Sequence, residues 1–149
     1  MAKDIERKFL VSGSGWRKRA DRGKSIRQAY LAFTKTISLR VRTIGKDKAY
    51  LTIKSAQSGK SRSEFEYPIP IKDARAHMKL RTGRLIKKRR HIVKSGKSSF
   101  EVDVFKGDHH GLVLAEVELP TERSRFERPD WLGKDVTDEE RSYNANLAK

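Results

Sequence analysis

The chain has 149 residues, a length that suits one domain and is too short for two sizeable ones. It contains no cysteine, which excludes a disulfide scaffold, thiol catalysis and cysteine-ligated metal centres. Its 35 Lys and Arg residues outnumber 19 Asp and Glu, so the formal net charge is +16 and the chain should attract polyanions. No stretch approaches the ~18 apolar residues of a membrane span, and we expect a single domain over residues 1–149 in the cytoplasm.

Eight segments, taken in chain order, alternate in a way that favours β-strands. They are residues 4–11, 25–31, 38–42, 50–54, 64–67, 85–93, 101–104 and 115–119. Turn residues lie between several of them, at Gly45, Gly96 and Gly107. Eight antiparallel strands can close into a barrel, which would leave no exposed sheet edge.

Three further segments favour helices. Residues 15–22 form a short and weak candidate, and Asp73 is placed to cap a helix over residues 74–81. Thr137 with Glu140 matches a capping box and predicts a C-terminal helix through about Ala148.

Charged residues of both signs recur on one face of the expected strands. Residues 38–42, for example, place Arg40 and Arg42 on one face and Leu39 and Val41 on the other. In a filled barrel such charges lie outside in solvent, whereas charges lining a lumen are costly unless they are paired or bind a ligand. The alternation alone leaves both arrangements open, and it does not say whether Lys88 and Arg90 or Lys87 and Arg89 share the inner face.

A series of short motifs resembles the CYTH, or triphosphate tunnel metalloenzyme, family. The N-terminal segment Asp4-Ile5-Glu6-Arg7-Lys8 is similar to the family's Glu-x-Glu-x-Lys signature. The remaining motifs follow in the family's order over nearly the whole chain: Arg27-Gln28, residues 39–42, 51–54, 62–67, 85–90, 101–103, 115–119 and Tyr143-Asn144. The resemblance is strongest to the compact bacterial members.

This resemblance implies an eight-stranded antiparallel closed β-barrel, mainly β with a few helices including a C-terminal one, whose lumen is a charged tunnel. It also implies binding of a triphosphate substrate with a divalent metal. Seven basic residues match the inward positions that would bind the phosphates: Lys8, Arg27, Arg40, Arg42, Lys54, Lys88 and Arg90. Arginine can grip phosphate oxygens in a bidentate manner, and lysine acts as a point charge.

Eight carboxylates match the remaining inward positions. Asp4, Glu6, Glu116 and Glu118 would be neighbours on the first and last strands of a closed barrel, and we assign them to a metal, Mg²⁺ or Mn²⁺. Glu64, Glu66, Glu101 and Asp103 would orient the basic residues or complete a second metal site. No residue stands out as a catalytic base, and phosphoryl transfer can proceed largely by positioning and electrostatics.

The function expected from this resemblance is metal-dependent hydrolysis of inorganic tripolyphosphate to pyrophosphate and phosphate. The alternatives are an adenylate cyclase that forms cyclic AMP and pyrophosphate, a thiamine triphosphatase, and a non-enzymatic binder of polyphosphate or RNA. The expected site is almost balanced in charge, so the surplus positive charge lies outside it and could contact polyphosphate or nucleic acid. The sequence leaves the oligomeric state open, a homodimer included.

Overall fold

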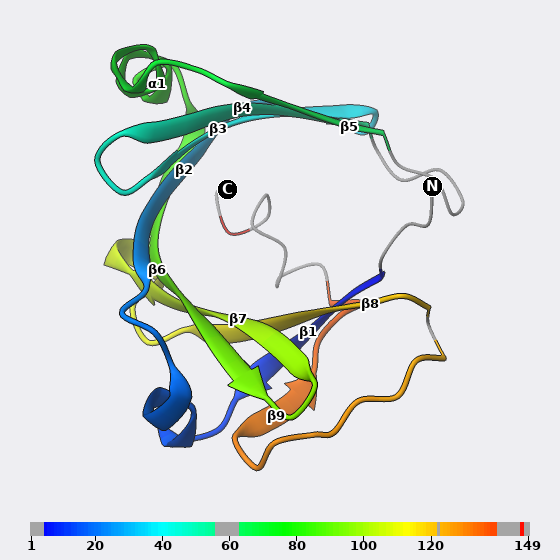
Figure 1. Ribbon diagram of the computed structural model, residues 1–149. Coiled ribbons are helices and arrows are strands. Elements are labelled where there is room, and N and C mark those ends of the chain that lie inside the picture. The colour runs from blue at the N-terminus through cyan, green and yellow to red at the C-terminus, as the bar shows by residue number, and fades with distance from the viewer. Residues whose placement is uncertain (1–4, 56–62, 122, 140–146, 148–149) are drawn as a thin grey trace. The chain divides into compact units, whose positions relative to one another are not determined.

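The computed structural model describes residues 5–55, 63–121, 123–139 and 147, and these residues are mainly β (Figure 1). Its helical elements are one α-helix, α1 (Ile71–Met78), and two short 3₁₀ helices, η1 (Gly15–Arg19) and η2 (Gly107–His109). The strands are β1 (Ile5–Val11), β2 (Lys24–Phe33), β3 (Ile37–Ile44), β4 (Lys48–Ser55), β5 (Glu64–Pro68), β6 (Thr82–Ser95), β7 (Ser98–Lys106), β8 (Val113–Leu119) and β9 (Leu132–Asp135). All eight expected strands are therefore present.

The strands form one sheet in the order β5-β4-β3-β2-β6-β7-β8-β1-β9. The expected closed barrel of eight strands is wrong in two respects: there is a ninth strand, and no hydrogen-bonded ladder joins β5 to β9 within the described residues. The second edge of β1 is instead taken in part by β9, through the pairs Phe9 with Asp135 and Val11 with Leu132. β9 has four residues and no alternating pattern, which is why the sequence did not predict it.

Within the described residues the helices differ from those expected. Residues 15–19 form a single 3₁₀ turn, and α1 begins after Pro70, with Asp73 inside its first turn and not at its cap. The expected C-terminal helix falls mostly on residues outside the described ranges. Thr137 and Asp138 lie in a turn, the Thr137 side chain donates to Asp135, and Thr137 caps no helix among the described residues.

Glycine at two hairpin turns supplies a backbone angle that other residues rarely adopt. Gly45 has a φ of 65° between β3 and β4, and Gly96 has a φ of 59° between β6 and β7. The β6–β7 loop has two residues, and positive φ at the first of them is what a type II′ turn requires. These turns set the registers that place charged residues on one face.

The chain divides into two compact units, residues 1–24 with 88–142 and residues 25–87 with 143–149. In the first unit one face of β1, β7 and β8 is apolar and packs against η1 and β9. Its buried residues are Phe9, Trp16, Val93, Phe100, Val102, Ala115, Val117, Leu119 and Leu132. Because this face is occupied by the core, the charged residues of these strands point to the other face.

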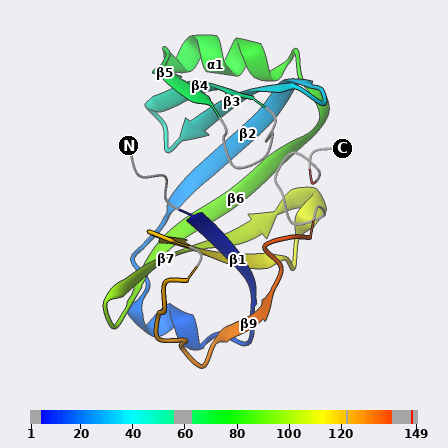
Figure 2. The same ribbon diagram turned by 90° about the vertical axis from the view of Figure 1, so that its right-hand side faces the viewer.

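In the second unit α1 packs across one face of β3 and β4 (Figure 2). The buried residues there are Ala29, Val41, Ala49, Ala74 and Met78. The opposite face of β3 and β4 carries Arg40, Arg42 and Thr52. No helix among the described residues is long and apolar enough to span a membrane.

Candidate functional site

The first unit gathers charged side chains on the face of its sheet opposite the apolar core. Glu6 lies directly across from Glu118, and Lys8 lies across from Glu116, in the antiparallel pair of β1 and β8. Glu101 of β7 lies across from Glu116 on its other side. Since residues two apart share a face, Asp103 belongs to the same face, which we call the β1–β8 charged face.

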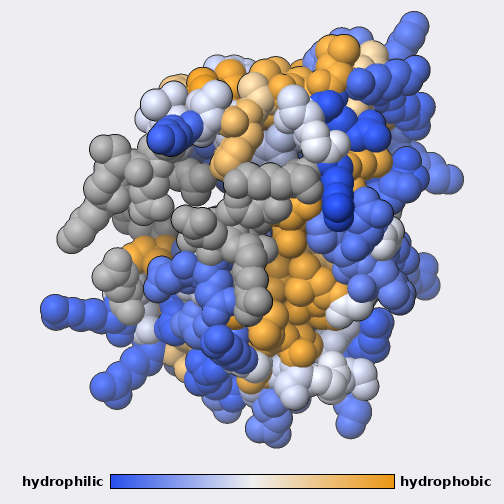
Figure 3. Space-filling model, turned by 180° about the vertical axis from the view of Figure 1, so that it is seen from behind, coloured by the Kyte–Doolittle hydropathy of each residue, from blue (hydrophilic) through white to orange (hydrophobic). Residues whose placement is uncertain are grey.

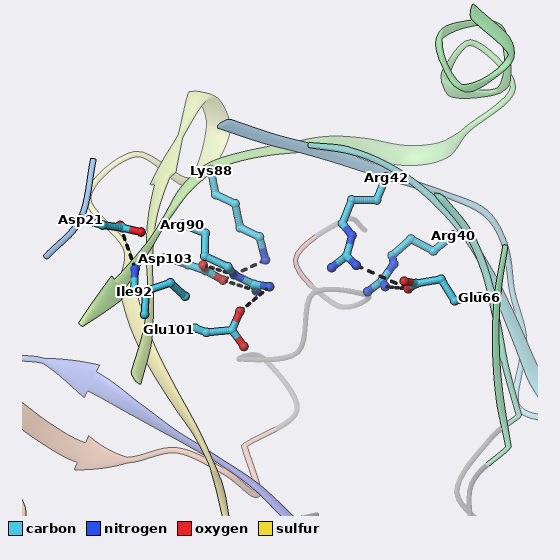
Figure 4. A network of polar contacts seen from close by, with 9 residues as sticks. All are labelled: Asp21, Arg40, Arg42, Glu66, Lys88, Arg90, Ile92, Glu101 and Asp103. Atoms are coloured by element: carbon cyan, nitrogen blue, oxygen red, sulfur yellow. Dashed lines mark hydrogen bonds and ion pairs between the residues drawn. The ribbon is translucent and has the colours of Figure 1, made fainter. Parts of the chain in front are cut away.

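β6 contributes two basic residues, Lys88 and Arg90, that contact carboxylates of this face (Figure 4). Arg90 makes a bidentate contact with Asp103, with Nε 2.8 Å from Oδ1 and Nη2 2.9 Å from Oδ2. Its Nη1 lies 2.9 Å from Glu101. The Lys88 ammonium lies 2.9 Å from Asp103 Oδ2 and 5.4 Å from the centre of the Phe105 ring. Lys88 and Arg90, and not Lys87 and Arg89, therefore share the charged face.

These contacts shift the pKa values of Asp103 and Arg90. Burial raises the pKa of Asp103, but the charge of Lys88 and the hydrogen bond from Arg90 outweigh it and hold this pKa at about 2. Burial lowers the pKa of Arg90, and the hydrogen bond and charge of Asp103 more than compensate, so that the pKa is raised overall. Asp103 and Arg90 are therefore charged at neutral pH, and the bidentate contact between them fixes the positions of both side chains.

Glu6 and Glu116 form a different kind of pair. Burial raises the pKa of Glu116, the neighbouring Glu6 carboxylate raises it further, and the opposing effects of Lys8 and Arg90 leave it at about 8. Two carboxylates this close repel when both are ionised, and a proton or a cation between them relieves the repulsion. Glu6 and Glu116 thus supply two of the carboxylate oxygen ligands that a hard divalent cation prefers.

The backbone of Lys8 is fixed by the segment that follows β9. Val136 N donates to Lys8 O at 2.8 Å, and Lys8 N donates to Thr137 Oγ1 at 3.0 Å. The neighbouring Arg7 pairs with Asp135 on the other face of β1. These contacts hold the strand that carries Glu6 and Lys8, so both side chains project from a rigid element.

The second unit has its own charged face, on β3, β4 and β5. Glu66 lies 3.4 Å from Arg42 Nη2 and 3.9 Å from Arg40 Nη2, as Figure 4 shows, and it accepts a hydrogen bond from Thr52 at 3.1 Å. Lys54 lies 3.7 Å from Glu64. We call this set the β3–β5 charged face; its two arginines both lie within 4.0 Å of the Glu66 carboxylate.

Arg27 does not belong to this face, which corrects the expectation from the sequence. In the β2–β3 pair Arg27 lies across from Thr43, so it shares a face with Ala29 and Val41, against which α1 packs. Its side chain is exposed. The residue of β2 that lies across from Arg42 is Gln28.

Thr52 and Gln28 are not among the site residues predicted from the sequence. The alternation of β4 does place Thr52 on the same face as Lys54, but an uncharged threonine does not by itself indicate a phosphate site. Gln28 follows Arg27 directly, and the structure places Gln28, not Arg27, on the face of Arg42. Asp4 lies outside the described residues. Within the described ranges no group of three or more His, Asp or Glu residues is arranged as a metal site.

The clustered arginines, lysines and carboxylates on these sheet faces are groups that can bind phosphate anions. The comparisons identify the family: the CYTH domain matches residues 2–146, and the chain belongs to the CYTH domain family.

Curated relatives support the same conclusion. The chain is 43% identical over 150 residues to a protein of Acetivibrio thermocellus named inorganic triphosphatase, covering 100% of this chain and 95% of the relative. It is 36% identical over 152 residues to an inorganic triphosphatase of Nitrosomonas europaea, covering 97% and 96%. The solved structure of the inorganic triphosphatase NE1496 superimposes with a TM-score of 0.75 at 34% identity, covering 99% of this chain and 95% of that one.

Proposed function

We propose that the protein is a metal-dependent inorganic triphosphatase that hydrolyses tripolyphosphate to pyrophosphate and phosphate. The relatives named inorganic triphosphatase span the whole chain at 43% and 36% identity, which supports this activity. The structural observation that carries the proposal is the Lys88–Arg90–Asp103 cluster, in which a buried ammonium and a guanidinium are held by one carboxylate. Such fixed cations stabilise negative charge on a phosphate chain without reorganising.

In this proposal the basic residues of each charged face are the candidates for binding phosphate groups. They are Lys8, Arg40, Arg42, Lys54, Lys88 and Arg90; Arg27 is left out because it lies on the other face of its strand. Glu64, Glu66, Glu101 and Asp103 act as positioning residues, since each lies within 4.0 Å of a Lys or Arg nitrogen. Arg40 Nε is buried with no hydrogen-bond partner among the described residues, so this guanidinium has a donor to offer to a phosphate oxygen.

Glu6, Glu116 and Glu118, together with Asp4, would hold Mg²⁺ or Mn²⁺. The position of Glu116 beside Glu6 supports this assignment: burial and the Glu6 charge disfavour ionisation of Glu116, and a cation bound to both carboxylates would favour it. A bound divalent metal would supply charge neutralisation of the phosphates and a more acidic bound water. The chain's own contribution is to hold the substrate in line, and no dedicated base is assigned.

Product analysis tests the function and separates it from the alternatives. Tripolyphosphate, ATP and thiamine triphosphate are offered separately, each with Mg²⁺, with Mn²⁺ and with EDTA. We expect orthophosphate and pyrophosphate from tripolyphosphate with metal, and none with EDTA. Cyclic AMP with pyrophosphate from ATP would assign the protein to cyclases, faster cleavage of thiamine triphosphate would change the substrate, and no turnover at all would leave a binding protein.

The basic exterior is a separate question. Hydrophilic side chains cover much of the face shown in Figure 3, and the chain carries a net charge of +16. Contact of this surface with polyphosphate or nucleic acid stays a prediction, as do the cytoplasmic location and a homodimer. Binding that weakens steeply with salt but is insensitive to EDTA would assign such contact to the exterior and not to the metal-dependent site.

A further inference from the structure

Gln28 is a fully buried polar residue, 0% exposed, in the middle of β2. Its Cα partner on β3 is Arg42, so its side chain belongs to the face that carries Arg40 and Arg42. The neighbouring positions on the same face of β2 are the buried Ile26 and Tyr30. Gln28 is thus the single amide side chain of β2 and lies beside the β3–β5 charged face.

Both polar atoms of this amide lack hydrogen bonds. Neither Nε2 nor Oε1 of Gln28 has a partner in the part of the chain that the structure describes. Buried polar side-chain atoms are nearly always hydrogen-bonded, because a buried donor or acceptor without a partner loses its bond to water and gains nothing. A leucine or methionine would fill the same space without this penalty, so packing alone gives no reason for an amide here.

From this arrangement we infer that Gln28 contacts the substrate; the inference rests on the proposed function. Its Nε2 donates to a phosphate oxygen of the triphosphate bound at Arg42. An ionised triphosphate offers only acceptors, so Oε1 requires a donor that arrives with it, and a water molecule on the phosphate chain is such a donor. Gln28 therefore holds a phosphate oxygen and a water together, which makes it a positioning residue for that water.

The decisive variant is Gln28→Leu, which keeps most of the volume and removes both polar atoms. Because it removes two buried groups without partners, we expect the melting temperature of the ligand-free protein to stay the same or rise. The rise in melting temperature caused by tripolyphosphate should shrink, and kcat/KM for tripolyphosphate should fall by about tenfold or more. A residue with a purely structural role would show the opposite: a less stable protein with an unchanged response to ligand.

A second variant of Gln28 tests the donor separately, and a control variant tests the effect of packing. Gln28→Glu keeps the shape and the acceptor but replaces the donor with a charge that repels phosphate, so we expect a larger loss of tripolyphosphate binding than with leucine. Ile26→Val is the matched control, since it changes packing two residues away on the same face. It should leave both the ligand-induced shift and kcat/KM within about twofold of the parent protein.

The turnover measurement tests the proposed function, and the thermal-shift measurement tests the contact of Gln28 with the substrate, so the two hypotheses can be rejected separately. If the parent protein is stabilised by tripolyphosphate but does not cleave it, the proposed function is wrong, and the shift of Gln28→Leu still decides the role of Gln28. If Gln28→Leu and Gln28→Glu both keep the parent's ligand-induced shift, Gln28 does not contact the substrate. The same conclusion follows if the parent protein shows no shift with tripolyphosphate at all. Should the leucine variant not fold, Gln28→Glu and Gln28→Asn provide the same comparison.

Discussion

Lys88 and Asp103 form an ion pair in which Nζ and Oδ2 lie 2.9 Å apart, and the Lys88 side chain is fully buried. A buried ammonium that loses its counter-ion keeps its desolvation penalty without compensation. We therefore expect Asp103→Asn to lower the free energy of unfolding by about 3 kcal/mol at pH 7. Glu101→Gln should cost less, because Arg90 keeps Asp103. Urea unfolding of both variants measures the difference, and equal losses would contradict this account.

Because the pKa of Asp103 is lowered in the folded protein, we expect the free energy of unfolding to fall at acid pH. This pKa is about 2 in the folded protein against an ordinary value of 3.8, so the unfolded chain binds more protons between these values. The stabilisation is therefore complete above about pH 5 and is lost as the pH falls through the folded-state pKa near 2; its size is about 2 kcal/mol. The measurement is the difference in unfolding free energy between the parent protein and Asp103→Asn, which should narrow from pH 5 to pH 2. A constant difference would mean that another group causes the acid sensitivity.

Alternation predicted the strands and most of the charged positions because a β-strand repeats every two residues. It could not choose between Lys87 with Arg89 and Lys88 with Arg90, since all four are basic and either pair fits. The structure decides through partners: Lys88 and Arg90 contact Asp103, whereas Arg89 donates to the backbone carbonyls of Arg22 and Gly23.

The predictions from the sequence that the structure contradicts also have physical causes. Arg27 and Gln28 are adjacent, so they point to opposite faces, and only the pairing of Gln28 with Arg42 tells which faces the charged cluster. The ninth strand pairs through two positions and carries one buried apolar residue, too little to produce a pattern. The motifs predict the order of the strands along the chain. They do not predict whether the sheet closes into a barrel, because closure requires hydrogen bonds between the two edge strands, and the alternation of residues does not show which strands pair.

Arg27 and Arg42 provide a direct test of the corrected assignment. Arg42 contacts Glu66 on the β3–β5 charged face, whereas Arg27 is exposed on the face against which α1 packs. Arg42→Ala should lower kcat/KM for tripolyphosphate by about a hundredfold, the typical cost of one charged donor in a transition-state site. Arg27→Ala should stay within about twofold. If the two variants lose activity equally, the register argument for Arg27 is wrong.

Glu66 is expected to act through the arginines that it holds. It lies within 4.0 Å of both Arg40 and Arg42 and accepts from Thr52. Glu66→Gln keeps the shape but weakens the contact with both guanidinium groups, so we expect KM for tripolyphosphate to rise and kcat/KM to fall by about tenfold. Glu64→Gln is the matched control on the same strand; its carboxylate contacts Lys54 at the longer distance of 3.7 Å, and it should lose less. An unchanged KM in Glu66→Gln would show that the arginines need no such support.

The position of Glu116 leads us to expect that a divalent metal stabilises the folded protein. Burial and, after it, the neighbouring Glu6 carboxylate raise the pKa of Glu116 to about 8, so a cation that binds both groups should stabilise the folded protein. We expect Mg²⁺ or Mn²⁺ to raise the melting temperature of the parent protein and EDTA to reverse the rise. Glu116→Gln should abolish this rise and should by itself make the metal-free protein no less stable, because it removes a carboxyl group whose ionisation is unfavourable at this buried position beside Glu6. Glu127→Gln, on an exposed loop residue, should keep the full response to metal. A metal-induced rise that survives in Glu116→Gln would place the cation elsewhere on the chain.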